Sequence, residues 1–284
     1  MNNFITSDQK VIKRIVKSSG SSFFWGMNIL KPNRKRAMFA VYAFCRTVDD
    51  IADSELTFEQ KSLYLNNWIK KIEKIYQGFS DDSLSRELKF SIEKYNLIKN
   101  DFLEIIDGMR IDAKKKIIYP TKKFLEVYCD KVAGAVGCLS IDIFGVENKF
   151  AGRNYAKYLG RALQLTNIIR DINEDNNRGR CYIYKEALTK NNIKMKPNEL
   201  MKSEKLEIVR EEVFQLAEKY YFLADNEATK IDKRYIVASE IMKEMYFRLF
   251  QKMKKKKWNY KKRVRLSFYD KFFIIFSVLL RRKN

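Results

Sequence analysis

Two pairs of aspartates, each with three residues between its members, stand far apart in this sequence. Asp49 and Asp53 form the first pair, and Asp171 and Asp175 form the second. Residues four apart share one face of a helix, so each pair predicts two carboxylates side by side. Like charges one turn apart repel, and acids at a helix C-terminus oppose the macrodipole. A single pair is most often a solvated helix end, but two pairs within apolar segments indicate a site for a cation.

The sequence contains no histidine, and this limits the chemistry that the acids can perform. Ser-His-Asp and Cys-His nucleophile systems, histidine-ligated zinc and a histidine general base are excluded. Oxygen ligands without histidine or cysteine select hard cations, and Mg²⁺ typically binds one or two carboxylates while bridging to phosphate oxygens. We therefore expect Mg²⁺, with Mn²⁺ as an alternative, and a diphosphate substrate.

Arginines close to the acidic pairs would add positive charge for a leaving diphosphate. They are Arg46, Arg170, Arg178 and Arg180. If the helices enclose an apolar interior with metal ions at its mouth, the matching substrate is a long hydrocarbon with a diphosphate head. The cation formed by ionising an allylic C–O bond needs a dry cavity and aromatic faces, and neither requires histidine.

The elements that position these residues are predicted to be helices. Only 10 glycines and 3 prolines occur in 284 residues, which disfavours turn-rich β architectures and long linkers. Pro32 and Asn33 are expected to form a turn and a cap, and Thr121 is a candidate N-cap. The apolar periodicity predicts helices over 34–53, 63–75, 84–97, 102–109, 121–144, 155–175, 204–228 and 235–253. The sequence thus predicts an all-α bundle, organised as a single domain over residues 1–284.

Two short segments each allow two interpretations. The small residues between Ala133 and Gly137 lie inside a predicted helix, where they permit either tight helix packing or the close approach of a ligand. Residues 19–22, Ser-Gly-Ser-Ser, form either a helix cap or a loop that holds an anion. Neither segment is a P-loop or a dinucleotide fingerprint, and the sequence contains no such motif elsewhere.

The cysteines and the N-terminus favour a cytoplasmic protein. No C-x-x-C pair occurs, so buried free thiols are expected rather than disulfides or metal ligands. The residues concerned are Cys45, Cys129, Cys138 and Cys181. The first eight residues contain no apolar core of the length that a signal peptide needs.

A formal net charge of +22 raises nucleic acid as a partner and, with it, a basic helical scaffold as an alternative function. Lysines on solvated helix faces are the simpler interpretation, so we expect neither a nucleic-acid partner nor an obligate protein partner. Much of the excess follows residue 250, and the apolar run 272–280 is shorter than the roughly 20 residues of a membrane span. Residues 266–284 are expected either to dock on the inner face of a membrane or to close the bundle as its last helix.

Three segments closely resemble the squalene/phytoene synthase family. They are AFCRTVDDIAD at 43–53, YCDKVAGAVG at 128–137, and LQLTNIIRDINED at 163–175 followed by RGRCY at 178–182. The resemblance keeps the same order from about residue 21 to residue 265. It implies an isoprenoid synthase fold, a helical bundle with a central apolar cavity, in which two prenyl diphosphates are condensed head to head.

The resemblance also implies a set of site residues. The Mg²⁺-binding acids would be Asp49, Asp53, Asp171 and Asp175. The residues that hold diphosphate or its metal shell would be Ser22, Arg46, Gln164, Asn167, Arg170 and Arg180. Four aromatic residues would line the channel or contact the diphosphate, namely Phe23, Tyr42, Tyr128 and Tyr182. Ala133 and Gly137 would also bind the substrate, and Tyr246 and Arg263 would occupy the matching C-terminal positions.

Within the family, the motifs look most like the bacterial hopanoid-pathway branch, which makes presqualene diphosphate from farnesyl diphosphate. The alternatives are phytoene synthase, which condenses two geranylgeranyl diphosphates, and squalene or dehydrosqualene synthase. NADPH is not expected. The lack of a nicotinamide fingerprint supports this only weakly, because reductive squalene synthesis does not use a Rossmann site.

Overall fold

The computed structural model describes residues 6–18, 23–114, 117–255 and 263–281. Over these ranges the chain is helical, and the β structure is limited to an isolated bridge between Ile118 and Cys181. The elements are α1 (Ser7–Ser18), α2 (Phe23–Asn28), α3 (Pro32–Asp53), α4 (Phe58–Tyr76), α5 (Ser83–Tyr95), α6 (Lys99–Lys114), α7 (Lys122–Cys129), the π-helical turn η1 (Asp130–Gly134), α8 (Ala135–Phe144), α9 (Lys149–Asn177), α10 (Lys185–Lys190), α11 (Pro197–Leu200), α12 (Lys205–Ala228), α13 (Lys233–Lys255) and α14 (Phe268–Arg281). The predicted all-α class is confirmed.

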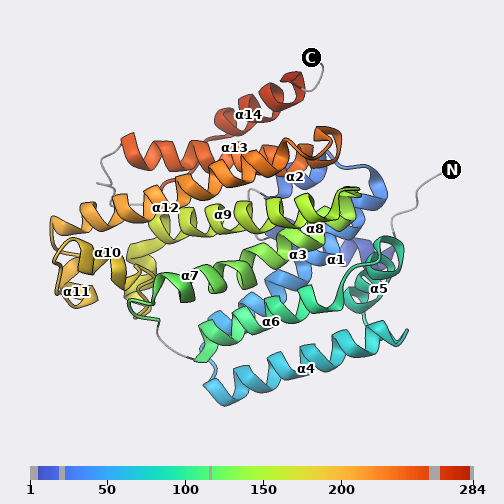
Figure 1. Cartoon of the computed structure of the whole chain (residues 1–284). Coiled ribbons are helices and arrows are strands. Elements are labelled where there is room, and N and C mark those ends of the chain that lie inside the picture. Colours follow the sequence, from blue (N-terminus) through green and yellow to red (C-terminus); the bar gives the residue numbers. More distant parts are fainter. Residues whose placement is uncertain (1–5, 19–22, 115–116, 256–262, 282–284) are drawn as a thin grey trace.

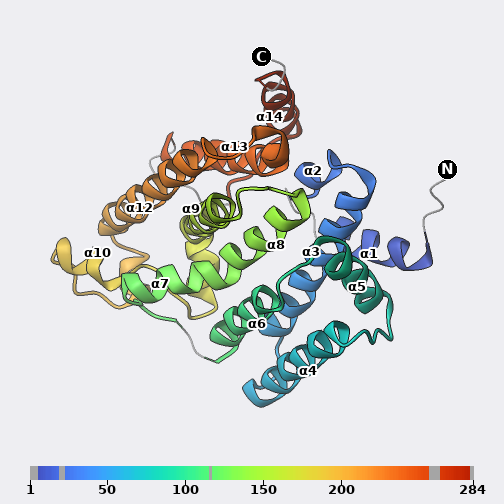
Figure 2. The same ribbon diagram turned by 45° about the vertical axis from the view of Figure 1, so that its right-hand side comes forward.

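The long helix α9 forms the centre of the bundle (Figure 1). It packs most extensively against α12 and also contacts η1, α7, α8 and α13. Figure 2 shows α9 nearly end-on, with α12 and α13 on one side of it and α8 on the other. The second acidic pair, on α9, is therefore carried by the helix that packs most extensively against the rest of the bundle.

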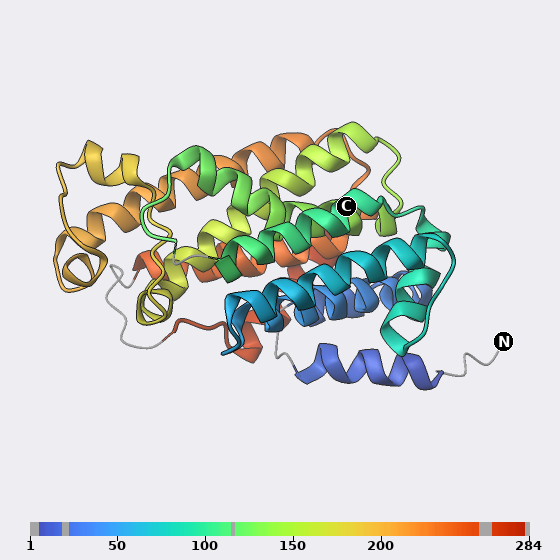
Figure 3. The ribbon, with the colours of Figure 1, turned by 90° about the horizontal axis from the view of Figure 1, so that it is seen from below.

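The first acidic pair is carried by α3, which packs against α5, α6 and α8. Seen from below, α4 lies alongside α3 and covers it from one side (Figure 3). At the edge of the bundle, α1 packs on α3 and α5 and buries Ile12 and Val16. Both acidic helices are thus fixed by packing along most of their length.

The predicted helices are confirmed, with differences at their ends. The Thr121 side chain caps α7 by accepting a hydrogen bond from the backbone N–H of Phe124. Pro32 and Asn33 do not form a separate turn and cap but are the first residues of α3, after an N-cap at Lys31. This is favourable because proline lacks only an N–H that the first turn leaves unpaired. The start of α9 was also misplaced: Asn148 caps it, and the helix begins at Lys149.

Four helices were not predicted, namely α1, α2, α10 and α11. Three of them are short, with six residues in α2 and α10 and four in α11. Segments of this length contain too few turns for an apolar period to be recognised. The fourth, α1, is rich in polar residues and is held by its two buried side chains.

The predicted helix 121–144 widens for one turn at η1 (Asp130–Gly134), which joins α7 to α8. Here α9 comes very close: a Cβ atom on Gly160 would lie 2.6 Å from the backbone nitrogen of Gly134. One on Gly137 would lie 3.0 Å from the carbonyl oxygen of Ala156. The small residues of this segment therefore serve tight packing, which was the first of its two interpretations.

The C-terminal part of the described chain returns over α13 as α14, the outermost helix in Figure 1. Lys252 of α13 pairs with Asp270 at 2.6 Å, and Arg281 pairs with Glu244 at 3.2 Å. Among the described residues, no helix is both long and apolar enough to cross a membrane. The four cysteines are free thiols, three buried and Cys45 half-buried, as predicted.

Candidate active site

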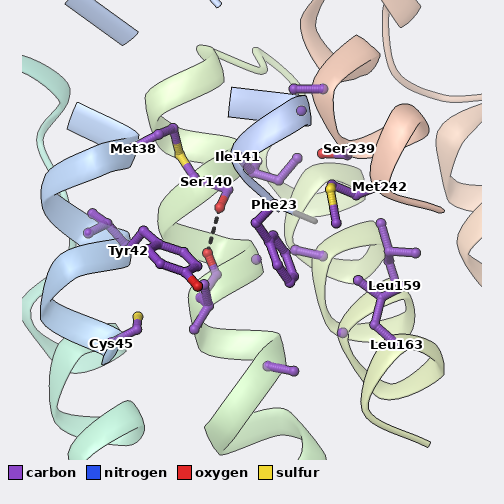
Figure 4. Close-up of a pocket in the computed structure, with 18 of the residues that line it drawn as sticks. Phe23, Met38, Tyr42, Cys45, Ser140, Ile141, Leu159, Leu163, Ser239 and Met242 are labelled. Atoms are coloured by element: carbon purple, nitrogen blue, oxygen red, sulfur yellow. Dashed lines mark hydrogen bonds between the residues drawn. The ribbon is translucent and has the colours of Figure 1, made fainter. Parts of the chain in front are cut away.

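An apolar cavity of about 230 Å³ lies between α2, α3, η1, α8, α9 and α13. Figure 4 shows Phe23 and Tyr42 projecting into it, with Leu159 and Met242 on the opposite wall. Ala133 and Gly137 also line the cavity, so the second interpretation of this segment holds together with the first. The predicted central apolar cavity is confirmed.

Three of the aromatic residues expected in the channel meet at this cavity. The ring of Phe23 lies 6.3 Å from that of Tyr42 and 6.0 Å from that of Tyr246, centre to centre. They come from α2, α3 and α13, respectively. Aromatic faces carry negative electrostatic potential, so this wall is suited to a transient carbocation.

One end of the cavity is polar, and Gln164 and Asn167 of α9 form it together with Tyr246. Asn167 Nδ2 donates a hydrogen bond to Gln164 Oε1 at 3.2 Å. The Oδ1 atom of Asn167 is buried and accepts no hydrogen bond from the described residues. One further turn of α9 reaches Asp171. The same helix therefore leads from the apolar wall to the second acidic pair.

Two arginines hold Asp171. Arg170 Nε donates to Oδ1 at 2.7 Å, and Arg263 contacts Oδ1 and Oδ2 at 2.9 Å each. Arg263 comes from the segment before α14, so the structure brings this distant predicted residue to the acids. Burial, and next the negative charge of Asp171, raises the pKa of Asp175 to about 7. The negative charge of Asp175 is therefore not fully balanced by the arginines around it.

The acids of α3 have a similar environment. Arg46 contacts Asp49 at 3.2 Å and Asp50 at 2.5 Å. Burial, and next the charge of Asp53, nonetheless raises the pKa of Asp49 to about 6, although 44% of its side chain is exposed. Each predicted metal-binding pair therefore contains an acid that would gain from a nearby cation.

The two acidic helices are joined at their ends. Asp53, the last residue of α3, pairs with Arg178 at 2.8 Å and with Arg180 at 3.1 Å. These arginines follow α9 directly. The first acidic pair therefore lies beside the end of the helix that carries the second, as a shared site requires.

A residue that the sequence did not single out, Asp112 of α6, lies next to this junction. Tyr128 and Tyr182 both donate hydrogen bonds to its carboxylate, at 2.8 Å each. Their rings stack with centres 5.3 Å apart. Burial raises the pKa of Asp112 and is the largest influence on it. No spacing pattern reveals this residue, because its partners are 16 and 70 positions away.

The other predicted residues gather at the cavity or around its polar end, except that Ser22 lies outside the described residues. Among the described residues, no three histidine, cysteine, aspartate or glutamate side chains converge into a group that could hold a metal ion. Instead, arginines form ion pairs with the aspartates. The site is a cluster of alternating positive and negative groups at one end of an apolar cavity.

Comparisons with known proteins agree with this arrangement. The model of the squalene/phytoene synthase family matches residues 16–270. Presqualene diphosphate synthase of Zymomonas mobilis is 37% identical over 264 residues, which cover 92% of this chain and 89% of the relative. Phytoene synthase 1 of Arabidopsis thaliana is 33% identical over 172 residues, covering 59% of this chain and 40% of that enzyme.

A solved structure extends the agreement to three dimensions. The crystal structure of a dehydrosqualene synthase in complex with a ligand superimposes with a TM-score of 0.86 at 26% identity. The match covers 97% of this chain and 96% of the other. Because the motifs, the cavity with its acidic end and the fold over nearly the whole chain all agree, this chain belongs to the squalene/phytoene synthase family of prenyltransferases.

Proposed function

We propose that the protein condenses two molecules of farnesyl diphosphate head to head and releases presqualene diphosphate. The observation that carries this proposal is the continuity of α9, which lines an apolar cavity at Leu159 and Leu163 and then presents Asp171 and Asp175. A hydrocarbon tail and a diphosphate head would lie along such a helix in this order. The likeness to presqualene diphosphate synthase over most of both chains supports the choice of reaction.

Mg²⁺, with Mn²⁺ as an alternative, would be held by Asp49, Asp53, Asp171 and Asp175. The donor set fits a hard cation, because it consists of carboxylate oxygens. The raised pKa values of Asp49 and Asp175 show that the neighbouring arginines do not fully offset burial and like charge, and the Oδ1 atom of Asn167 is buried without a donor among the described residues. When bound, the metal neutralises the charge that develops on the departing diphosphate.

The arginines of the site would change partners when substrate arrives. Arg46, Arg170 and Arg263 pair with aspartates in the structure. A diphosphate carries more negative charge than a carboxylate and can accept hydrogen bonds from the same guanidinium groups. Transfer of an arginine from carboxylate to phosphate leaves the carboxylate free for a cation. In this proposal, the ion pairs keep the charged groups in place until the substrate binds.

The apolar wall would control the carbocation that follows. Joining C1 of one farnesyl group to the C2–C3 double bond of the other releases one diphosphate and leaves a tertiary cation. Loss of a proton from this cation closes the cyclopropane ring. With no histidine in the chain, the released diphosphate is the base we propose. The faces of Phe23, Tyr42 and Tyr246 would stabilise the cation, and the apolar lining would keep water away from it.

The reaction would end at presqualene diphosphate, since conversion to squalene requires a hydride from a donor such as NADPH. The test is to incubate the protein with farnesyl or geranylgeranyl diphosphate, with and without NADPH, and to identify the products by mass spectrometry. We expect presqualene diphosphate from farnesyl diphosphate, independent of NADPH and abolished by EDTA. Accumulation of dehydrosqualene without presqualene diphosphate at any time, or a preference for geranylgeranyl diphosphate, would contradict the proposal.

The metal assignment has its own test. Asp49→Asn and Asp171→Asn should each abolish Mg²⁺-dependent consumption of farnesyl diphosphate while the fold, followed by circular dichroism, survives. Asp50→Asn is the matched control: Asp50 also pairs with Arg46 but lies on another face of α3 and is 56% exposed. It should keep most of the activity. Unchanged turnover in either of the first two variants would refute the metal assignment.

A further inference from the structure

The outward surface of α14 consists of large apolar side chains, with Arg281 as the one exposed basic residue at its described end. We call this surface the outer face of α14. Its residues are between 49% and 74% exposed and are Phe268, Tyr269, Phe272, Phe273, Phe276 and Leu280. No residue of α14 is fully buried. A helix on the surface of a globular protein normally turns its charged residues outward, so this pattern is reversed.

Packing of α14 into the bundle does not account for the outer face. The opposite side of the helix does pack against the core, through Ile274, Ile275, Val278 and Leu279. Asp270 and Arg281 are engaged with α13. The interpretation of this segment as a closing helix therefore explains one side of α14, whereas Phe272, Phe273 and Phe276 remain uncovered.

A groove between α13 and α14 continues the outer face. It is lined by Phe247, Arg248 and Gln251 from α13 and by Phe273 and Leu280 from α14, among others. Its two acids, Glu244 and Asp270, are each paired with a basic residue. Arg248 is exposed and has no ion pair with any described residue. The groove thus combines an apolar floor with a free positive charge.

Positive charge also dominates the surroundings. The described residues between 244 and 281 include eight lysines and arginines but only two acids. A second copy of the chain would bring the same positive charge against this surface, which is unfavourable. An anionic lipid bilayer complements both the basic charge and the apolar side chains of this surface, because its headgroups are negative and its interior is apolar.

We propose that the outer face of α14 docks the protein on an anionic bilayer. A helix of 14 residues is about 21 Å long, which suits it to lie in the headgroup region rather than to span the membrane. The basic residues around it would contact the phosphates, and the phenylalanines would enter the acyl boundary. The cytoplasmic leaflet carries the negative surface potential that this arrangement needs.

The docking surface lies close to the cavity. The ring of Trp25 on α2 contacts that of Phe268 at 5.7 Å, and Lys271 lies 6.0 Å from the same indole. On α2, the neighbouring residues Gly26 and Met27 line the cavity. One short helix therefore separates the apolar interior from the lipid, so that a product with a long hydrocarbon tail and a diphosphate head has a short route to the bilayer surface.

Flotation of the full-length protein with vesicles tests the docking. The vesicles contain phosphatidylcholine with or without one quarter phosphatidylglycerol. We expect binding to the anionic vesicles that weakens with added salt. The double variant Phe272→Gln/Phe276→Gln should lower the vesicle-bound fraction by roughly tenfold or more, since two apolar anchors are lost. Phe150→Gln/Phe222→Gln is the control, because these two phenylalanines are 78% and 64% exposed but belong to other helices.

Several outcomes would overturn the proposal. These are failure of the parent protein to bind anionic vesicles, equal flotation of the α14 variant and the parent, and equal loss of binding in the control variant. Light scattering without vesicles tests the alternative occupant: a dimer of the parent that becomes monomeric in the α14 variant would assign the outer face to a second copy. All altered side chains are exposed, and equal melting temperatures would verify that the variants fold. The readout needs no substrate, so its result is independent of the proposed reaction.

Discussion

Arg180 donates a hydrogen bond from Nη1 to Oδ1 of Asp53 across 3.1 Å, which joins the segment after α9 to the last residue of α3. Its Nη2 lies 3.4 Å from the backbone carbonyl of Asp112 on α6. One guanidinium from the loop after α9 thus connects α3 and α6 at the acidic end of the cavity, and only 14% of its side chain is exposed.

Arg180→Lys should impair substrate binding far more than Arg178→Lys does. A lysine keeps the charge but has no planar fork to reach two partners and a phosphate. We expect the KM for farnesyl diphosphate to rise about tenfold or more in the first variant and less than about threefold in the second. Arg178 pairs with the same Asp53 but is 58% exposed, so it is the matched control. Similar steady-state constants for both variants would contradict a special role of Arg180.

Asp175→Asn should stabilise the metal-free protein at high pH. Burial raises the pKa of Asp175 to about 7 from an ordinary 3.8, so the folded state binds more protons than the unfolded state between these values. Stability is therefore lost as the pH rises from about 4 to about 7. In EDTA, we expect the variant to melt above the parent at pH 8 and the difference to shrink toward pH 5.

Thermal melts at several pH values measure this difference. Asp107→Asn serves as the control, since this acid of α6 is 46% exposed and pairs with Arg110. A melting difference between the Asp175 variant and the parent that is constant from pH 5 to pH 8 would argue against the buried charge as its cause.

Gly160→Ala should destabilise the fold, whereas Gly134→Ala should not. A Cβ at Gly160 would lie 2.6 Å from the backbone of Gly134, which cannot yield. A Cβ at Gly134 would have its nearest contact at 3.5 Å, with a side-chain oxygen of Asp130. We expect the free energy of unfolding in urea to fall by about 1–3 kcal/mol for the first variant. For the second it should change by less than about 0.5 kcal/mol, and a comparable loss in both would be inconsistent with this packing.

Asp112→Asn should disturb the two tyrosines at the junction together. The amide has one acceptor oxygen for the two hydroxyls of Tyr128 and Tyr182, so one of these hydroxyls loses its acceptor at a cost of about 1 kcal/mol. A double-mutant cycle with Tyr128→Phe, measured by urea unfolding and by the KM for farnesyl diphosphate, tests the coupling. We expect the effects to be less than additive in both measurements. Full additivity would mean that the hydrogen bond contributes to neither stability nor substrate binding.

Much of the fold and of the site could be predicted from local pattern. The acidic pairs and the arginines beside them follow from helical spacing, and the Thr121 cap follows from one side chain. Asp112 could not be found in this way, because its importance depends on hydroxyls from two distant parts of the chain, Tyr128 of α7 and Tyr182 of the loop after α9. The turn η1 was also missed, because it lies within a continuous helical pattern and packs closely against Gly160 of α9, which is distant in the sequence. Sequence periodicity does not indicate which side chains from separate helices or loops are in contact.

The roles of the individual site residues stay predictions, although the structure places nearly all of them at the cavity or at its acidic end. Arg263 is the clearest case. It lies 92 positions from Asp171 in the sequence, yet its guanidinium contacts that carboxylate. Ser22 cannot be placed, since it lies outside the described residues.

The uninterrupted course of α9 makes the site far more sensitive to insertions and deletions than to substitutions. Between Leu163 on the cavity wall and Asp171 at its mouth, every residue adds about 1.5 Å of length and about 100° of rotation. One inserted residue would turn both acids of this helix away from the cavity, and seven would restore their direction but move them about 10 Å too far. Natural variation in this stretch should therefore change side chains while keeping the number of residues constant.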